Sequence, residues 1–306
     1  MSAITQQSAT SGQIKQINRF ASDAVEKVLT ELGLDNPGAQ RVIEHGDDFA
    51  EAIRTAAITS LKDLSVTDKF KNEEVKSNYT YPKEYKGPKP INDQIKAIAK
   101  IFGLDPSHAL EFAKTLPELP NGAEGWFAIP SVDALAAKHF PEVTDPIQKY
   151  CQAVQLVHTN IADSRSFYNY REGQITPAQL RVHARTAHAL DLIAETQKGD
   201  ILIVAAQLGM RHRGKSVRRA REVFVANEFG LGSLAVGSIV LTHPKRLVRW
   251  EELDMDCSGD EFSPEAAGGF SRSSCFGFSD GGVGFGARFV GGPLYFFGSV
   301  SGFLSQ

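Results

Sequence analysis

Apolar residues recur at helical spacing at the start of the chain. Between Ile14 and Leu32 they lie mostly three, four or seven positions apart, which predicts an amphipathic helix, and Gly33 predicts its end. Asn36-Pro37 predicts the start of a second helix, because proline is tolerated in a first helical turn. The segment Asn78–Pro90 carries three prolines and predicts a linker or an extended crossing.

Further helix signals follow up to residue 198. Ile95, Ile98 and Phe102 predict a short amphipathic helix. Asp105-Pro106 and Asp145-Pro146 pair a capping residue with a proline at the first helical position. Thr176-Pro177 predicts another start, with a helix that runs through Leu180, Ala184, Leu190 and Ile193. We therefore expect residues 1–198 to form a helical domain.

The pattern changes at residue 199. Ile201–Leu208 is a continuous apolar run that predicts a buried strand, and Ala235–Leu241 and Trp250–Met255 predict two more. From Phe270 onward, short runs that contain Phe alternate with Gly, as in strands joined by tight loops. The expected fold class is α+β: a helical domain over 1–198, then a mixed α/β domain over 199–306.

Composition and charge narrow the functional classes. Hydrophobic residues make up 42% and charged residues 23%, which is typical of a globular protein, and the net charge of −3 gives no overall attraction to nucleic acid or anionic lipid. The three cysteines show no CxxC spacing and favour a reducing compartment. Neither a signal peptide nor an apolar run long enough for membrane insertion is evident, so we expect a cytoplasmic protein.

A basic cluster lies between residues 211 and 221. One interpretation is phosphate binding at the start of a helix that continues to Phe229. The candidate phosphate-binding residues are Arg211, Arg213, Lys215, Arg218 and Arg219. The alternative is a solvated helix face that pairs with the acidic stretch Glu251–Glu261, and the sequence favours it because no aromatic residues interleave with the arginines.

Four carboxylates lie within eight residues: Asp254, Asp256, Asp260 and Glu261. Hard cations bind several oxygen ligands, so this spacing is one hypothesis for a cation site in an enzyme, although it does not match an EF-hand. A solvated loop, or salt bridges to the arginines, is the favoured interpretation. The sequence contains no HExxH, Walker, GxSxG or kinase motif. We expect no catalytic residues, no cofactor and no metal.

The most unusual stretch is Ala266–Ser305, which lacks Lys, Glu, Gln, Met and Trp altogether. These five types make up about a fifth of an ordinary soluble chain. They share no physical property, so a folding constraint does not account for their joint absence, whereas a codon constraint does. The stretch is instead rich in Gly, Phe and Ser. Its eight Phe residues favour a folded segment over a disordered one.

Residues 199–306, with the order strand, basic helix, buried strand, acidic turn and Gly-rich short strands, and with this restricted tail, resemble the variable proteins of diversity-generating retroelements. In that family, which is bacterial, a reverse transcriptase mutates the adenines of a template repeat, and the copy replaces the 3′ end of the target gene. Hypervariable AAY codons cannot yield Lys, Glu, Gln, Met or Trp. The resemblance covers about the last third of the chain and implies a C-type-lectin-like (formylglycine-generating-enzyme-like) fold for residues 199–306, with the variable segment at about 266–305.

The resemblance implies a non-catalytic protein that binds an unknown protein or other macromolecule through a hypervariable surface. Phe276, Phe278, Phe285 and Phe303 are the expected scaffold. The expected variable, ligand-binding positions are Arg272, Ser274, Cys275, Gly277, Arg288, Val290, Leu294, Tyr295 and Phe297. Tyr, Phe and Arg anchor partners, while Gly and Ser give adaptable contacts. The helical domain would dock to a host complex or form a homo-oligomer. The alternative function is a nucleic-acid-associated protein that uses Arg211–Arg221.

Overall fold

The computed structural model of the 306-residue chain describes residues 11–54, 68–266 and 268–305. The chain divides into two compact units, with the division between Ser65 and Val66. Each unit is described by itself.

The described part of the first unit is helical. Helix α1 (Ser11–Leu32) ends at Gly33, whose φ of +55° is the left-handed conformation that glycine adopts readily. Helix α2 (Asn36–Glu44) begins where Asn36-Pro37 predicts, and the Asp35 carboxylate caps it by accepting from the Gly38 N–H at 2.7 Å. A further helical stretch covers 46–54. Both helices leave apolar side chains exposed, with Ile43 71% exposed.

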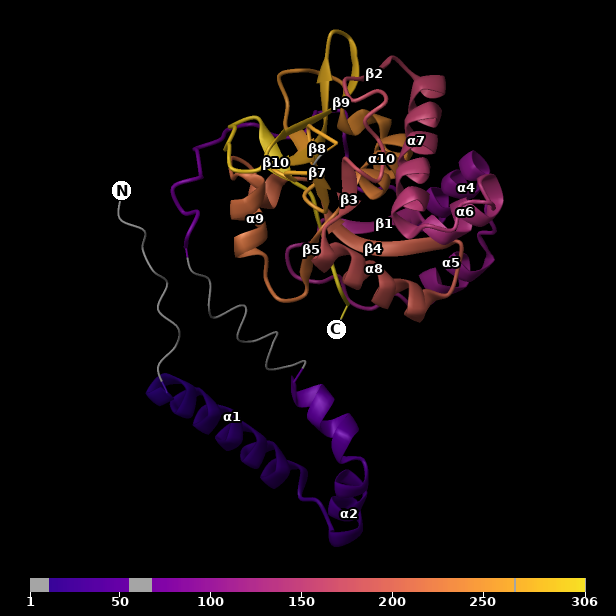
Figure 1. Cartoon of the computed structure of the whole chain (residues 1–306). Helices are drawn as coiled ribbons and strands as arrows, with labels where there is room; N and C mark the ends of the chain where they lie inside the picture. The colour runs from indigo at the N-terminus through magenta and orange to yellow at the C-terminus, as the bar shows by residue number, and fades with distance from the viewer. Residues whose placement is uncertain (1–10, 55–67, 267, 306) are drawn as a thin grey trace. The chain divides into compact units, whose positions relative to one another are not determined.

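The second unit is built around a four-stranded antiparallel sheet in the order β1-β4-β11-β5. Its strands are β1 (Gly125–Pro130), β4 (Ile201–Gln207), β11 (Ser301–Phe303) and β5 (Glu228–Gly230). All of β4 is buried, as the continuous apolar run predicts. Strand β11, close to the C-terminus, lies between β4 and β5, so the end of the chain is held inside the sheet (Figure 1).

Helices cover both faces of this sheet. Figure 1 shows α8 and α5 on one side of β1 and β4, and α7 and α10 on the other. The helices are α4 (Ile91–Phe102), α5 (Ser107–Phe112), α6 (Val132–His139), α7 (Pro146–Ser164), α8 (Ala184–Gln197), α9 (Val217–Val223) and α10 (Ser233–Thr242). Short 3-10 turns occupy Ala113–Thr115, Met210–His212 and Pro244–Arg246.

A second sheet is formed mainly by the C-terminal region. Its main path runs β10-β6-β8-β7-β3, and β9 pairs with β8 and with β2. The strands are β2 (Phe167–Asn169), β3 (Leu180–Val182), β6 (Asp254–Asp256), β7 (Asp260–Phe262), β8 (Arg272–Ser279), β9 (Gly282–Phe289) and β10 (Phe297–Ser299). The Gly- and Phe-rich tail therefore folds into strands, as its pattern predicts.

The expected boundary between residues 198 and 199 is not where the structure divides. Strand β1 lies before that point and β4 after it, yet they pair along their whole length, from Gly125 with Ala206 to Pro130 with Ile201. Helix α7 likewise packs against α10. Local signals predicted several of the helices within 91–198, but they could not show that the apolar faces of these helices cover strands contributed by 199–306.

Three local predictions are also corrected. Residues 235–241, expected to be a strand, belong to the buried helix α10, because a short and mostly apolar run fits either structure. The helix expected from Thr176 starts only at Ala184, and Leu180–Val182 forms β3 instead. Of the strand expected over 250–255, only Asp254 and Met255 lie in β6.

The α+β fold class is therefore confirmed. Among the described residues, no helix combines the length and the apolar character needed to cross a membrane.

Candidate functional site

The β8–β9 hairpin forms the centre of the C-terminal surface. Ser279 pairs with Gly282, and the two residues between them, Asp280 and Gly281, have φ of 51° and 78°. Two successive positive φ angles are what a type I′ turn requires, and Asp-Gly is a preferred sequence for it. The turn fixes the register of the hairpin and hence the side of the sheet on which each residue lies.

One face of the hairpin belongs to the core. Phe276 and Phe285 are opposite each other in the register, are fully buried, and have ring centroids 5.1 Å apart. The His158 ring from α7 packs on Phe285 at 4.2 Å. Burial lowers the pKa of His158 to about 3, so this imidazole is neutral. Phe303 is buried in β11, and Phe278 packs partly buried against the same core.

Three expected variable positions are not on the surface. Ser274 is fully buried on the core side, where its hydroxyl bonds to the Asp260 carboxylate. Cys275 is buried opposite Gly286, and Phe297 is buried with its ring 4.6 Å from the Arg288 guanidinium. The expectation that these three side chains are displayed is thus corrected. Residues 273–276 are all buried, so both faces of β8 are covered at this point, and alternation along the strand identifies no exposed face there.

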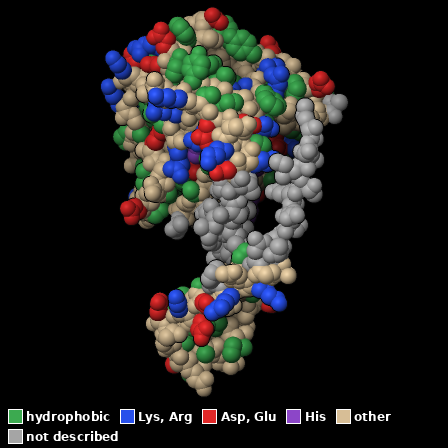
Figure 2. Space-filling view, turned by 90° about the vertical axis from the view of Figure 1, so that its left-hand side faces the viewer, with side chains coloured by type: hydrophobic (Ala, Val, Ile, Leu, Met, Phe, Trp, Pro, Cys, Tyr) green, Lys and Arg blue, Asp and Glu red, His purple; other side chains and the backbone are tan. Residues whose placement is uncertain are grey.

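The remaining expected positions lie at or near the surface. Tyr295 is 51% exposed. The others, which are half-buried, are Arg272, Gly277, Arg288, Val290 and Leu294. The sequence analysis missed Phe289, which is 53% exposed at the end of β9. On the face seen in Figure 2, hydrophobic side chains gather toward the top of the larger unit, above a zone where basic and acidic side chains mingle.

The loop between β9 and β10 is held by an earlier segment of the chain. The Ser77 hydroxyl donates to the backbone oxygen of Tyr295, and the rings of Tyr79 and Tyr295 lie 5.4 Å apart. At the other end of the loop, the backbone N–H of Arg218 donates to Val290 O at 3.0 Å, and the Arg218 guanidinium lies beside Gly291. The loop is therefore fixed at both ends while the Tyr295 ring remains available.

Gly277 lies against a carboxyl group. A Cβ added at Gly277 would be 2.5 Å from Asp254 Oδ2, so a larger residue there requires the Asp254 side chain to shift. Asp254 is 9% exposed and accepts from the Phe278 N–H at 3.3 Å. Burial raises its pKa to about 8, so it is largely protonated at neutral pH. Gly277 is therefore a half-buried position that accepts little variation while Asp254 keeps this conformation.

The acidic residues expected as one cation site are held apart by separate partners. Asp256 pairs with Arg288 at 2.8 Å, and Glu261 pairs with Arg181 at 2.8 Å. Asp260 accepts from the Tyr150 hydroxyl at 2.6 Å and from the hydroxyls of Ser233 and Ser274. No group of His, Cys, Asp or Glu among the described residues has the arrangement to hold a metal ion.

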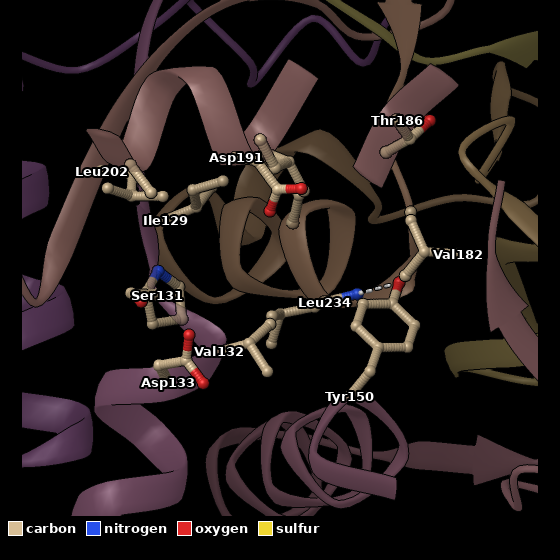
Figure 3. A pocket seen from close by; sticks show the side chains of 15 residues that line it. Ile129, Ser131, Val132, Asp133, Tyr150, Val182, Thr186, Asp191, Leu202 and Leu234 are labelled. Carbon is tan, nitrogen blue, oxygen red and sulfur yellow. Dashed lines mark hydrogen bonds between the residues drawn. The ribbon is translucent and has the colours of Figure 1, made fainter. Parts of the chain in front are cut away.

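The small cavity beside this Asp260 network has mostly apolar walls. It has a volume of about 100 Å³ and lies between α6, α8, α10 and the ends of β1 and β4. Figure 3 shows Tyr150 and Leu234 at one end, where the Leu234 N–H lies 3.5 Å from the Tyr150 hydroxyl. Ser131, Asp133 and Asp191 line it as well. This volume is well below the ~300 Å³ of a typical ligand pocket.

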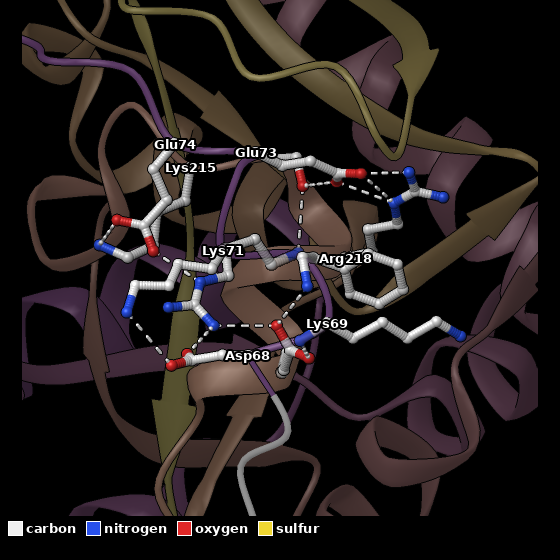
Figure 4. Close-up of polar contacts among 11 residues, drawn as sticks. Asp68, Lys69, Lys71, Glu73, Glu74, Lys215 and Arg218 are labelled. Carbon is white, nitrogen blue, oxygen red and sulfur yellow. Dashed lines mark hydrogen bonds and ion pairs between the residues drawn. The ribbon is translucent and has the colours of Figure 1, made fainter. Parts of the chain in front are cut away.

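The basic cluster is paired, but not with the expected acidic stretch. Arg218 Nε lies 2.8 Å and 2.9 Å from the two carboxylate oxygens of Glu73, and Figure 4 shows the two side chains facing each other. This hydrogen bonding lowers the pKa of Glu73. Arg219 bonds to Glu74 at 2.5 Å, and to Asp68 and Glu222 at 2.8 and 2.9 Å. The carboxylates come mostly from 68–74, a partnership that no sequence pattern predicts.

The other candidate phosphate-binding residues are similarly engaged. Arg211 lies 3.3 Å from Glu228, whose other oxygen is 2.6 Å from His212 Nε2. Arg213 donates to the backbone oxygen of Tyr79 at 3.0 Å, and Lys215 lies 3.9 Å from Glu74. Because carboxylates neutralise most of these charges, the five residues do not form an open phosphate site.

Comparison with models of known families, with curated proteins and with solved structures finds no match.

Proposed function

We propose that this protein binds a macromolecular ligand, without catalysis, through a surface formed by its C-terminal segment. The observation that carries the proposal is that residues 266–305 contain both buried scaffold residues and exposed aromatic residues. The same restricted alphabet supplies buried anchors, Phe276, Phe285 and Phe303, and exposed aromatic side chains, Phe289 and Tyr295. Large exposed aromatic residues on a fixed scaffold are typical of binding surfaces.

The backbone pairing of the C-terminal strands allows substitutions at exposed positions of this segment. Strand β11 lies between β4 and β5, and β8 is paired with β6, β7 and β9. Substitutions at exposed positions such as Tyr295 leave these pairings intact, because neighbouring backbone groups form the ladder. A fixed framework that carries tolerant loop positions is what a diversified binder needs.

We propose further that the segment is diversified as in retroelement variable proteins and that the second unit is a C-type-lectin-like domain. Two observations support this. The segment lacks all five amino-acid types that AAY codons cannot produce, and a C-terminal strand is inserted in a sheet covered by helices. The bound partner would then be a property of this variant, with Tyr, Phe and Arg as anchors and Gly and Ser as adaptable contacts.

For the first unit we propose docking or self-association. Helix α1 exposes Ile14, Ile17, Val28 and Leu32 along its length. Apolar side chains repeated at this spacing commonly pack against a second helix. A homo-oligomer would present several copies of the C-terminal surface, which raises the avidity for a multivalent ligand.

The deciding experiment is to sequence the 3′ end of the gene and its surroundings in several related isolates. The proposal expects variation concentrated in codons for half-buried or exposed residues such as Tyr295, Val290 and Phe289, beside a template repeat and a reverse transcriptase gene. Codons for Phe276 and Phe285 should not vary. An identical tail in all isolates, without a template repeat, would refute diversification.

A further inference from the structure

A second pocket lies beside the basic cluster, and the sequence did not indicate it. It has a volume of about 330 Å³, within the ~300–1,000 Å³ that small-molecule sites occupy. Its walls come from the start of α8, from α9 and the residues after it, and from Phe70, which a long stretch of chain separates from both helices. The lining residues are Phe70, His183, Arg185, Arg218, Arg221, Glu222, Phe224, Gly230 and Ser258.

Arg221 gives the pocket its positive charge. Its guanidinium donates to two backbone oxygens, Ser258 O at 2.8 Å and Asp260 O at 2.6 Å. No carboxylate of the described residues lies within ion-pair distance of it, in contrast to Arg218 and Arg219 on the same helix. Burial lowers its pKa, which means that the site destabilises the charged form it holds. Glu261, Asp260 and Asp256 act on it only at longer range, so an anion in the pocket would supply a direct ion-pair partner.

The neighbouring groups add to the positive potential. Arg185 and Arg218 line the same pocket, while the single acidic lining residue, Glu222, is directed to other partners. Its carboxylate accepts from the backbone N–H groups of Lys69 and Phe70 at 2.8 and 3.1 Å, as well as from Arg219. His183 caps α8 through Nδ1, which accepts from the Arg185 N–H at 3.3 Å. The cap fixes the orientation of the imidazole at the pocket wall.

The pocket also has apolar walls. The Phe70 ring stacks under Arg218 at 4.4 Å, and the Phe224 ring lies 5.9 Å from Arg185. An inorganic anion alone would leave these rings without contact. A ligand with a flat apolar body and one anionic end would contact the rings and the guanidinium groups together.

We propose that this pocket binds a small organic anion, with its anionic group on Arg221 and Arg185 and its apolar body against Phe70 and Phe224. Guanidinium groups bind carboxylate and phosphate oxygens through paired hydrogen bonds, so either anionic group satisfies the chemistry. The proposal is independent of the macromolecular surface, because none of these four residues belongs to 266–305.

The test uses the full chain and four probes: phenyl phosphate, benzoate, inorganic phosphate and phenol. Isothermal titration calorimetry and thermal unfolding are followed at low salt. Saturable binding is expected for phenyl phosphate, for benzoate or for both, and the comparison of the two shows which anionic group the site prefers. Inorganic phosphate should bind more weakly and phenol not measurably. Saturable binding of neither organic anion at millimolar concentration would overturn the proposal.

Variants locate the binding. Arg221→Gln, checked for folding by circular dichroism, is expected to weaken binding of the preferred probe about tenfold or more, the usual effect of losing a charge-assisted hydrogen bond. Arg185→Gln should act in the same direction, and it decides the matter if Arg221→Gln does not fold. Arg249→Gln is the charge-matched control, since Arg249 pairs with Glu84 and Glu252 and does not line the pocket. Wild-type affinity in both pocket variants, or an equal loss in the control, would refute the site.

Discussion

His158 and Phe285 connect helix α7 to the C-terminal hairpin, with ring centroids 4.2 Å apart in the interior of the second unit. Neither ring nitrogen of His158 has a hydrogen-bond partner among the described residues. Phe167 and Phe276 complete the aromatic surroundings, at 5.2 and 5.9 Å. The imidazole thus behaves as a buried aromatic spacer between the helix and the hairpin, and it is costly to protonate.

The first prediction concerns stability in acid. The folded pKa of His158 is about 3, below the usual histidine value of 6.5, so between these values the unfolded chain binds a proton that the folded chain does not. Stability from this site is complete above pH 6.5 and is lost as the pH falls toward 3, by at most ~1.4 kcal/mol per pH unit. His158→Leu should reduce that slope, measured by chemical denaturation at pH 7, 6, 5 and 4.

His188, which is exposed on α8, provides the control for this prediction. His188→Leu is expected to retain the wild-type dependence on pH. If His158→Leu and wild type lose stability in parallel between pH 6.5 and 4, the buried imidazole is not the cause.

Asp254 gives a prediction of opposite sign. Its folded pKa of about 8 lies above the unfolded value, so its contribution to stability is complete below about pH 4 and is lost as the pH rises through 8. Asp254→Asn keeps an acceptor for the Phe278 N–H but cannot ionise. The variant should gain stability over wild type between pH 5 and pH 8 by up to a few kcal/mol. An unchanged difference between variant and wild type at the two pH values would count against it.

The sequence correctly predicted those helices and strands whose own residues carry start, stop or burial signals. The apolar run of β4, the Asp145-Pro146 start of α7 and the Gly33 end of α1 all carry their own signals. It failed for α10, since a helix buried on all sides has no amphipathic period to distinguish it from a strand. The sequence analysis also placed a domain boundary at residue 198. Strands β1 and β4 pair across that point, but this long-range contact leaves no signal in a local pattern.

The candidate site was predicted only in part for the same reason. Phe276 was expected in the scaffold and Tyr295 at the surface, and both are found there, but Ser274 and Cys275 are buried because both faces of β8 are covered by parts of the chain that are distant in sequence. The pocket around Arg221 also needs Phe70. The two residues are about 150 positions apart in the sequence, so no local pattern indicates that they lie together.

A third prediction separates scaffold from surface within the restricted segment. Phe285→Ala should cost ~3–5 kcal/mol, because it leaves a cavity beside His158 and Phe276. Phe289→Ala should cost under ~1 kcal/mol, since that ring is half exposed and its contact with Arg218 is long at 5.8 Å. Urea titrations of the two variants make the comparison with the residue type held constant. Similar losses in both would show that Phe289 is part of the core.

The last prediction concerns the ion pair of Glu73 with Arg218, which ties residues 68–74 to α9. Glu73 is 8% exposed and accepts hydrogen bonds from Arg218 and Ser216. Glu73→Gln should lower the free energy of unfolding by about 1–3 kcal/mol at pH 7, since a hydrogen-bonded carboxylate partner is lost at a largely buried position. Because Arg218 holds the pKa of Glu73 below its usual value, this stabilisation is present above pH 4.5 and disappears as the pH falls through the folded pKa. The variant and wild type should therefore converge in acid.

A double-mutant cycle with Arg218→Gln isolates the pair, and Arg249→Gln, which breaks an exposed ion pair, should leave stability unchanged. A coupling energy near zero would mean that apolar packing, rather than this ion pair, holds residues 68–74 in place.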